Sequence, residues 1–507
     1  MPNDVRSPLA PPLSAARRWW ILAVVLAAEC MDLLDATVVN VAAPAIHSDL
    51  HTSSTGLQWI VGGYSLAVAI GLITGGRLGD LLGRRRLFVT GAVAFTVASL
   101  LCGIAPTTAT LIGFRLVQGL AAALLLPQGL GIIREVFPPE QLGAAFGVFG
   151  PVIGLAAVLG PIVGGALVQW DLAGTGWRLV FFVNLPLGAA AAAGAWRLLP
   201  RTAPAHRARL DLLGAVLSGI GCLALVYPLI QGRDEGWPVW TYALVALSLM
   251  VFVLLGLQQR RRVRRERDPL VLPSVFTHRG YTAGLVVMLL FFAGMGGVLL
   301  TMSVFLQVAQ RFSPIHTGVV FIPMSLGMAV GAGLSGGFLG KRFGRLALQG
   351  GVVLTLVGWL LVIAAVHRGG TAGAWALAPG LSLAGFGMGV TVAPLFDVIL
   401  ADVTDAETGS ASGLLNALQQ VSGAFGVAVL GTIFFAAVDA HGYAAALQRS
   451  LWVQVGSLVA VLLASALLPR MPRVGEPEAV VPAGVGPGRQ PAVADGSERR
   501  VGLPTEA

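Results

Sequence analysis

Residues Gly75–Leu87 read GGRLGDLLGRRRL, and residues Gly336–Leu348 read GGFLGKRFGRLAL. The second string follows the first at a distance of 261 residues, and the same distance separates two apolar segments that begin near Trp19 and Gly280. A chain that repeats both a loop and an apolar segment at one fixed period is built from two similar units. The repeat therefore predicts two halves of similar architecture, joined by a central segment.

The composition of the chain indicates what surrounds these halves. Of its 507 residues, 56% are hydrophobic and 11% are charged, whereas soluble domains carry about 25% charged residues. An ordinary soluble protein is therefore excluded, and most of the surface must face lipid. A helix needs about 20 apolar residues to cross roughly 30 Å of hydrocarbon. Fourteen segments are long enough, near residues 19–43, 57–76, 87–105, 108–133, 143–168, 177–199, 211–231, 238–258, 280–307, 315–337, 346–366, 374–400, 410–438 and 450–469.

Basic residues indicate the orientation of these segments, because cytoplasmic loops are enriched in Lys and Arg. Fourteen crossings place 27 basic residues on the cytoplasmic side, five on the other side and Arg115 inside a span. We therefore expect an all-α polytopic membrane protein with both termini cytoplasmic, in which two six-helix halves flank two extra central helices. Its expected parts are a cytoplasmic N-terminal segment (1–18), an N-terminal half (19–199), a linker with the two extra helices and a basic loop (200–279), a C-terminal half (280–469) and a disordered cytoplasmic tail (470–507).

Acidic residues mark one face of the first segment. Glu29, Asp32 and Asp35 are spaced three residues apart, so on a helix they fall within an arc of roughly 120°. Intramembrane acids are costly unless they face a cavity, find a partner or take up a proton, and they are therefore functional candidates. Arg115 needs a counter-charge, and we expect it to pair with one of these acids. The alternatives are a purely structural ion pair and, for Asp397 near the end of its span, an interfacial position.

Six strings along the chain carry a resemblance to a known family. They are LLDATVVNVAAP at 33–44, GRLGDLLGRRR at 76–86, RLVQG at 115–119, GPVIGLAAVLGPIVGG at 150–165, WRLVFFVNLPLG at 177–188 and GSASGLLNALQQVSGAFGVAVLGTIF at 409–434. In this order they closely resemble the fourteen-span drug:proton antiporter branch of the major facilitator superfamily. The match covers nearly the whole chain up to about residue 469. Such a fold places the substrate site at the midplane between two six-helix halves.

The resemblance implies how protons are handled. Asp35 matches the acidic position of the family's first-segment signature, and Arg115 matches an arginine that is thought to assist proton transfer through a nearby acid. With the neighbouring acids Glu29 and Asp32, they form the expected proton-coupling group. Closely spaced acids titrate as a coupled set.

The resemblance also implies residues that control conformation. In the family, the loop after the second segment latches the halves, here through Asp80 and Arg84 with the turn glycines Gly76 and Gly83. Lys341 replaces the acid in the second copy, so a latch on that side needs other partners. Glycines of the fifth segment permit close helix packing, and its Gly-Pro step resembles a motif of antiporters. The fifth-segment residues expected to matter are Gly160, Pro161 and Gly164.

Aromatic and amide side chains are the candidates for the substrate site. Aromatic rings stack on cations, and buried acids suit a cationic substrate, although the same rings could equally face lipid or the core. The candidate substrate-binding residues are Asn40, Trp59, Tyr64, Gln118, Phe291, Phe292, Asn416 and Gln420.

These features together predict a proton-driven exporter of drugs or related amphiphilic or cationic molecules that works by alternating access. A proton symporter for uptake and a dedicated exporter of one natural product are the alternatives. The lone lysine, Lys341, is followed by Arg342, so the Gly-Lys-Ser/Thr of an ATP-binding loop is missing. We expect no enzymatic activity, no cofactor or metal beyond the coupling protons, and no nucleic-acid partner. The expected location is the cytoplasmic membrane of a bacterium, where the protein is a monomer in contact with lipid.

Overall fold

The computed structural model describes residues 14–200, 210–368 and 374–468, and all of their regular elements are helices. The N-terminal half contains α1 (Ala15–Leu50), α2 (Ser54–Leu82), α3 (Arg84–Gly103), α4 (Thr108–Val136), α5 (Pro139–Trp170), η1 (Leu172–Gly174), η2 (Gly176–Arg178), α6 (Leu179–Phe182) and α7 (Asn184–Leu198). The linker contains α8 (Leu212–Gln231), α9 (Val239–Arg264) and η3 (Pro273–Thr277). The C-terminal half contains α10 (Arg279–Val304), η4 (Phe305–Ala309), α11 (Pro314–Leu334), η5 (Ser335–Leu339), α12 (Gly340–Phe343), α13 (Arg345–Arg368), α14 (Ala374–Leu400) and α15 (Asp405–Ser465).

The prediction of an all-helical polytopic membrane protein is confirmed. Among the described residues, eleven helices are long and apolar enough to cross a membrane, and the bent pair Pro139–Ala156 and Leu159–Trp170 makes a twelfth if it is one span. The count of fourteen spans stays a prediction. The expected terminal segments lie mostly outside the described residues, which begin at Ser14 and end at Leu468.

Polar caps define where several helices begin. The hydroxyl of Ser53 accepts the backbone N–H of Gly56 at the start of α2, and Asp211 accepts that of Gly214 at the start of α8. Thr107 and Thr404 begin α4 and α15 with capping boxes. These side chains satisfy backbone donors that have no partner within the helix. The caps therefore set the helix boundaries at the two polar ends of the bundle.

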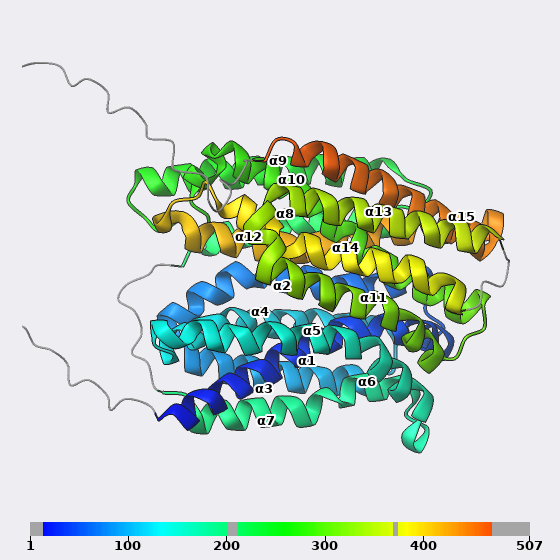
Figure 1. The fold of residues 1–507 in the computed structure, drawn as a ribbon, viewed down its shortest axis with the longest axis horizontal. Coiled ribbons are helices and arrows are strands. Elements are labelled where there is room, and N and C mark those ends of the chain that lie inside the picture. The colour runs from blue at the N-terminus through cyan, green and yellow to red at the C-terminus, as the bar shows by residue number, and fades with distance from the viewer. Residues whose placement is uncertain (1–13, 201–209, 369–373, 469–507) are drawn as a thin grey trace, which may run out of the picture.

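Arginines hold helix ends together at one end of the bundle, here called the arginine-rich end. Arg17 Nε donates to the carbonyl oxygen of Leu198 at 3.0 Å, which joins the start of α1 to the end of α7. In the other half, Arg345 donates to the carbonyl oxygen of Leu468 at 2.8 Å. The beginning of α1 and the end of α15 both lie toward the left of Figure 1. The first and last described helices therefore reach the same end.

The two halves meet near the opposite end of the bundle. Gln307 lies on η4, directly after α10, and its Nε2 donates to the carbonyl oxygen of Val41 on α1 at 2.8 Å. The hydroxyl of Thr432 on α15 lies 3.4 Å from Gln58 Oε1, in the second turn of α2. The helix pair α5 and α11 also packs across this seam (Figure 1). The halves are thus joined at the end far from the arginines.

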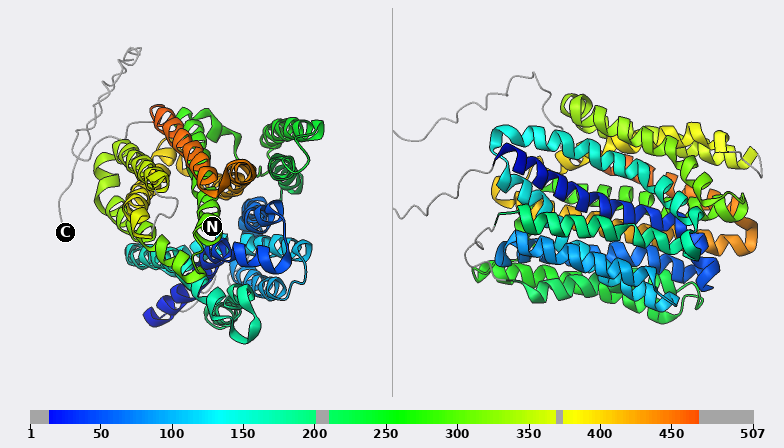
Figure 2. Two further views of the ribbon diagram at one scale, coloured as in Figure 1. Left: turned by 90° about the vertical axis from the view of Figure 1, so that its right-hand side faces the viewer. Right: turned by 90° about the horizontal axis from the view of Figure 1, so that it is seen from below.

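The linker helices lie on the outside of the bundle, although they separate the halves in the chain. Figure 2 shows the green pair α8 and α9 beside the two halves rather than between them. Helix α8 packs on α2 and α15, α9 packs on α8, and Thr432 donates to the carbonyl oxygen of Leu229 on α8 at 2.9 Å. The pair therefore covers the seam between α2 and α15.

The repeated string contains a glycine that we expect to be essential for helix packing. A Cβ at Gly75 would lie 2.1 Å from the carbonyl oxygen of Ala123 on α4, whereas a Cβ at the equivalent Gly336 would meet nothing within 4 Å. Gly75→Val should destabilise the protein by about 1–3 kcal/mol, because overpacking forces the backbones apart. A lower Tm of the detergent-solubilised variant would show this, with Gly336→Val as the matched control. Equal Tm values for both variants would contradict the close approach of α2 and α4.

Candidate functional site

A buried ion pair lies at the centre of the N-terminal half. Asp35 on α1 is 0% exposed and Arg115 on α4 is 1% exposed, and Arg115 Nη1 contacts Asp35 Oδ2. Arg115 Nε also donates to the carbonyl oxygen of Ile60 on α2 at 3.1 Å. A buried charge is tolerated only when it is paired and hydrogen-bonded. The structure thus places Asp35, rather than Glu29 or Asp32, as the counter-charge of Arg115.

Two amide side chains complete the shell of Asp35. Gln118 Nε2 on α4 and Asn184 Nδ2 on α7 donate to Asp35 Oδ1 at 2.9 and 2.8 Å. Gln118 Oε1 accepts from Arg115 Nη1 at 2.8 Å, which binds the glutamine to both members of the ion pair. The Asp35 carboxylate therefore accepts hydrogen bonds from three side chains on two helices.

Tyr64 on α2 connects the ion pair to a second acid. Its hydroxyl donates to Asp32 Oδ1, and its ring centroid lies 4.1 Å from the guanidinium carbon of Arg115. An arginine over an aromatic ring gains a cation–π interaction that grows stronger when water is excluded. Arg115 is thus held by Asp35 on one side and by the Tyr64 ring on another, and Tyr64 places Asp32 in the same network.

Glu29 is half-buried one helical turn below Asp32, toward the arginine-rich end. A Cβ at Gly129 on α4 would lie 2.8 Å from Glu29 Oε1, so the glycine makes room for the carboxylate. Glu29, Asp32 and Asp35 therefore lie on the face of α1 that is turned toward α2 and α4. They form a row of three carboxyl groups along α1 that ends at the fully buried Asp35.

Sequence reasoning missed two members of this network. Asn184 Nδ2 also donates to Ser99 Oγ on α3 at 3.0 Å, and Ser99 donates to the carbonyl oxygen of Phe181 at 2.9 Å. Asn184 begins α7 directly after the short helix α6. A lone amide in an otherwise apolar segment, two residues before Pro186, was the one available signal for this position.

The predicted substrate-binding residues are spread over several places. Tyr64 and Gln118 lie within the hydrogen-bonded network around Asp35, here called the Asp35 network, whose members are Asp32, Asp35, Tyr64, Ser99, Arg115, Gln118 and Asn184. Trp59 packs against Tyr227 of α8 with ring centroids 5.8 Å apart, on the side of the extra helices. The remaining candidates lie elsewhere: Asn40 is buried and donates to its own helix at Ala36, Phe291 and Phe292 are buried in an edge-to-face pair, Gln420 is half-buried and Asn416 is exposed.

The predicted latch pair lies within the N-terminal half. Arg84 Nη2 contacts Asp80 Oδ1 at 3.1 Å, and both side chains are about one-third exposed. Gly83 joins α2 to α3 with φ of 91°, a conformation that favours glycine. A Cβ at Gly131 on α4 would lie 1.7 Å from Arg84 Nη1, so the guanidinium lies directly on α4. Gly76 lies one turn before Asp80 and faces Pro127 of α4.

Glycines of α5 let this helix approach α1 closely. A Cβ at Gly160 would lie 2.1 Å from Thr37 Oγ1, and one at Gly164 would lie 2.9 Å from Val38 Cα. Pro161, predicted to act with them, has its carbonyl oxygen 2.5 Å from the position of a Cβ at Gly318 on α11. The predicted conformational residues of α5 therefore contact both α1 and the opposite half. Asp397 is exposed on α14, three residues before the helix ends at Leu400.

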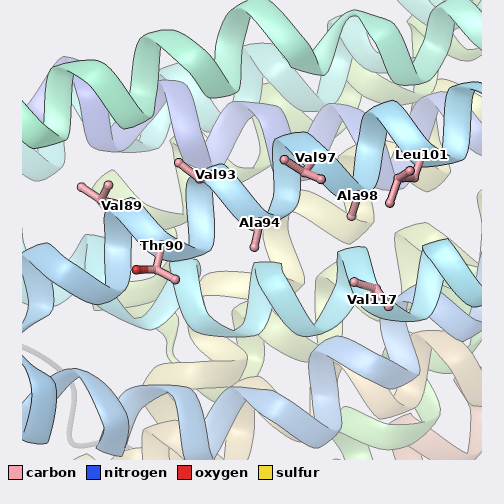
Figure 3. A pocket seen from close by; sticks show the side chains of 8 residues that line it. All are labelled: Val89, Thr90, Val93, Ala94, Val97, Ala98, Leu101 and Val117. Carbon is pink, nitrogen blue, oxygen red and sulfur yellow. The ribbon is translucent and has the colours of Figure 1, made fainter.

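A groove of about 480 Å³ lies between α3 and α4 (Figure 3). Its lining is apolar apart from the Thr90 hydroxyl, and Val93, Val97 and Val117 are about half-exposed at its surface. It contains none of the candidate site residues and no charged group that could orient a ligand. No cluster of three or more possible metal ligands occurs in the described ranges. The Asp35 network is therefore the candidate functional site.

Comparison with known proteins identifies the family of the chain. The model of the Major Facilitator Superfamily matches residues 25–427. A probable actinorhodin transporter of Streptomyces coelicolor is 47% identical, over 86% of this chain and 76% of that protein. A puromycin resistance protein of Streptomyces alboniger is 37% identical over 84% of this chain and 83% of its own length. A tetracenomycin C resistance and export protein of Streptomyces glaucescens is 35% identical, over 93% and 85%.

Solved structures share the fold. A bacterial homologue of the human lysosomal transporter Spinster, in an inward-facing and unoccupied conformation, superposes with a TM-score of 0.63 at 18% identity, over 90% of this chain and 98% of that one. A POT family transporter in complex with 5-aminolevulinic acid gives a TM-score of 0.65 at 13% identity, over 88% and 96%. At such identities the likeness concerns the fold alone. The family match covers most of the chain, and this chain therefore belongs to the Major Facilitator Superfamily and is a membrane transporter, not an enzyme.

Proposed function

We propose that this transporter exports antibiotic-like small molecules in exchange for protons. The observation that carries the proposal is the Asp35–Arg115 pair, a titratable group buried with its counter-charge in the middle of the bundle. Ionisable groups inside a membrane domain mark ion and proton pathways. Efflux itself is supported by relatives that are named for antibiotic transport or resistance.

We further propose fourteen crossings with both termini in the cytoplasm. The long helix α15 contains a break at Gly442, with φ of 75° and ψ of 170°, and each of its two arms is long enough to span. Helix α1 has 36 residues, but the carboxylates of Glu29, Asp32 and Asp35 lower the apolar character of its middle. Counting both arms, α1 and the bent α5 gives fourteen. The arginine-rich end then faces the cytoplasm, in accordance with the positive-inside rule.

The contacts between the halves support alternating access. With the arginine-rich end in the cytoplasm, the seam formed by Gln307 with Val41 and by Thr432 with Gln58 lies on the external side. Closure on the external side leaves the cytoplasmic side to admit substrate. The cycle then requires the seam to open after substrate has bound and to close again after a proton has bound.

Protonation of Asp35 supplies the coupling in this proposal. While Asp35 is ionised it neutralises Arg115, and the carboxyl groups of Asp32 and Glu29 lie on the same face of α1, which suits a cationic or amphiphilic substrate. A proton on Asp35 removes this charge, weakens the hold on the substrate and releases Arg115 from its partner. Each proton that moves inward supplies about 2.3 kcal/mol per 100 mV of membrane potential.

Everted membrane vesicles test the proposal directly. Actinorhodin and puromycin, which the relatives' names suggest, serve as probes. In respiring vesicles with an acidified interior, we expect uptake of at least one probe and a release of protons from the lumen when it is added. Collapse of the pH gradient should stop this uptake. Probe movement that ignores the gradient would overturn proton coupling, and whole cells that take up the probe together with protons would identify a symporter.

A further inference from the structure

The side-chain amide of Asn184 forms hydrogen bonds through its nitrogen but not through its oxygen. Asn184 is 0% exposed, and its Nδ2 donates to Asp35 Oδ1 at 2.8 Å and to Ser99 Oγ at 3.0 Å. Its Oδ1 is equally buried and accepts no hydrogen bond from the part of the chain that the structure describes. A buried acceptor without a partner is costly and calls for an explanation.

The shell of Asp35 suits only the ionised carboxylate. Arg115, Gln118 and Asn184 all direct N–H groups at its two oxygens. A neutral carboxyl group carries an O–H that needs an acceptor. Gln118 Oε1 already accepts from Arg115 Nη1 and from Cys102 Sγ. Among the amides that touch Asp35, Asn184 therefore has the one oxygen that is not engaged.

We propose that Asn184 is a positioning residue that holds Asp35 in both of its protonation states by turning its amide through half a turn. In the ionised state Nδ2 donates to the carboxylate, as the structure shows. When water on the open side delivers a proton to Asp35, the turned amide presents Oδ1 to the new O–H. The two orientations of an amide occupy nearly the same volume, so the turn displaces no neighbour. This inference rests on the proposed function, because it requires that Asp35 takes up the coupling proton.

The hydroxyl of Ser99 can change its hydrogen bonds when the amide of Asn184 turns. In the ionised state its hydroxyl donates to the carbonyl oxygen of Phe181 and accepts from Asn184 Nδ2. After the turn, the hydroxyl can rotate and donate to Asn184 Oδ1. The rotation therefore exchanges one hydrogen bond of the Ser99 hydroxyl for another.

Charged and titratable groups around Asp35 come from four helices. They are Asp32 on α1, Tyr64 on α2, Cys102 on α3 and Arg115 on α4. Helix α7 contributes the neutral Asn184 alone. Of these four, Arg115 is the one with a hydrogen bond to Asp35 among the described residues, and it only donates. The acceptor role therefore falls to Asn184.

Two transport modes separate the two roles of Asn184. Substrate exchange across the membrane uses only the states in which Asp35 is ionised. Net efflux also requires the protein to change conformation while Asp35 is protonated and therefore neutral. Asn184→Leu keeps the approximate volume but removes both donor and acceptor. We expect net proton-driven efflux of the exported probe, actinorhodin or puromycin, to fall about tenfold, the cost of one unpaired buried group. Exchange should stay within about threefold, because Arg115 and Gln118 still bind the carboxylate.

Serine variants provide the rescue and the control. Asn184→Ser returns a hydroxyl that can donate or accept, and it should recover net efflux relative to Asn184→Leu. Ser99→Ala should slow net efflux more than exchange. Ser248→Ala, which removes an equally buried hydroxyl that donates to the carbonyl oxygen of Gly221 between α8 and α9, should change neither.

The outcomes distinguish this inference from the proposed function. An equal loss of efflux and exchange in Asn184→Leu would overturn the acceptor role and leave Asn184 a structural donor. Wild-type efflux in Asn184→Leu would overturn the inference entirely. Both results are read against Asp35→Asn: if that variant keeps proton-coupled efflux, Asp35 does not take up the coupling proton and the premise of this inference is wrong, whatever the Asn184 variants do.

Discussion

Replacing Asp35 by asparagine is expected to abolish proton-coupled efflux while the protein still inserts into the membrane. The substitution keeps the size of the side chain but removes both its charge and its ability to titrate. Arg115 then loses its counter-charge in a site where it is 1% exposed, and an unpaired buried charge costs about 3–5 kcal/mol. We expect efflux to fall by about a hundredfold or more, in keeping with an energy of this size. Efflux of the probe from everted vesicles measures it.

Controls for this prediction separate chemistry from folding. Asp35→Glu retains an acid and should keep part of the efflux, whereas Asp35→Asn should keep none. Asp402→Asn removes an exposed carboxylate outside the network and should transport like the wild type. Equal amounts of protein in the membrane fraction and a similar elution volume in detergent are required of all three. Full efflux by Asp35→Asn would show that the coupling proton binds elsewhere, with Asp32 and Glu29 as the remaining acids.

Much of the fold could be predicted because a membrane permits few solutions. Backbone groups in hydrocarbon must be satisfied within a helix or a closed barrel, so apolar segments of about 20 residues indicate helices. The repeat of Gly75–Leu87 at Gly336–Leu348 then indicates the two halves. The location of α8 and α9 beside α2 and α15 could not be predicted. These helices are apolar on most sides, and no stripe on their sequence marks the face that contacts a neighbour.

The charged residues of the site could be predicted from the sequence, whereas the neutral residue Asn184 could not. Arg115 had to find an acid, because an intramembrane charge needs a partner, but three acids on one face of α1 were equally suitable by sequence. Asn184 lies 149 residues from Asp35 along the chain. A buried asparagine need not reach across helices at all, since Asn40 bonds to Ala36 within its own helix at 2.9 Å. Only the packing of α1, α3 and α7 shows which behaviour applies.

A second large effect is expected from Gly165→Val at the external seam. A Cβ at Gly165 on α5 would lie 2.4 Å from the carbonyl oxygen of Pro314 on α11 and 2.7 Å from Ile315 Cα. A Cβ at Gly318 on α11 would lie 2.5 Å from the carbonyl oxygen of Pro161 in return. These neighbours are backbone atoms, which cannot rotate away as a side chain can. A valine at either glycine must therefore push the two helices apart.

The separation of α5 from α11 shifts the equilibrium between the externally closed and externally open states, and it leaves the structure of each half unchanged. The seam joins α5 to α11, so the added methyl groups leave the Asp35 network untouched and raise only the free energy of the externally closed state. Overpacking of this kind costs about 1–3 kcal/mol, which lowers the population of the closed state by a factor of roughly 5 to 150. A transporter that cannot close externally cannot return to collect substrate. Net efflux by Gly165→Val should fall by a similar factor.

Cysteine labelling can follow the seam itself. Gln307, which bonds to Val41 across the seam, is replaced by cysteine in a chain whose Cys30, Cys102 and Cys222 are changed to serine. A membrane-impermeant maleimide added to whole cells should label this cysteine slowly in the parent and several times faster in Gly165→Val. Gly147→Val is the matched control on α5, because a Cβ there would meet nothing within 4 Å. If Gly165→Val transports and labels like this control, closure of α5 on α11 is not a step of the cycle, and alternating access at this seam is wrong.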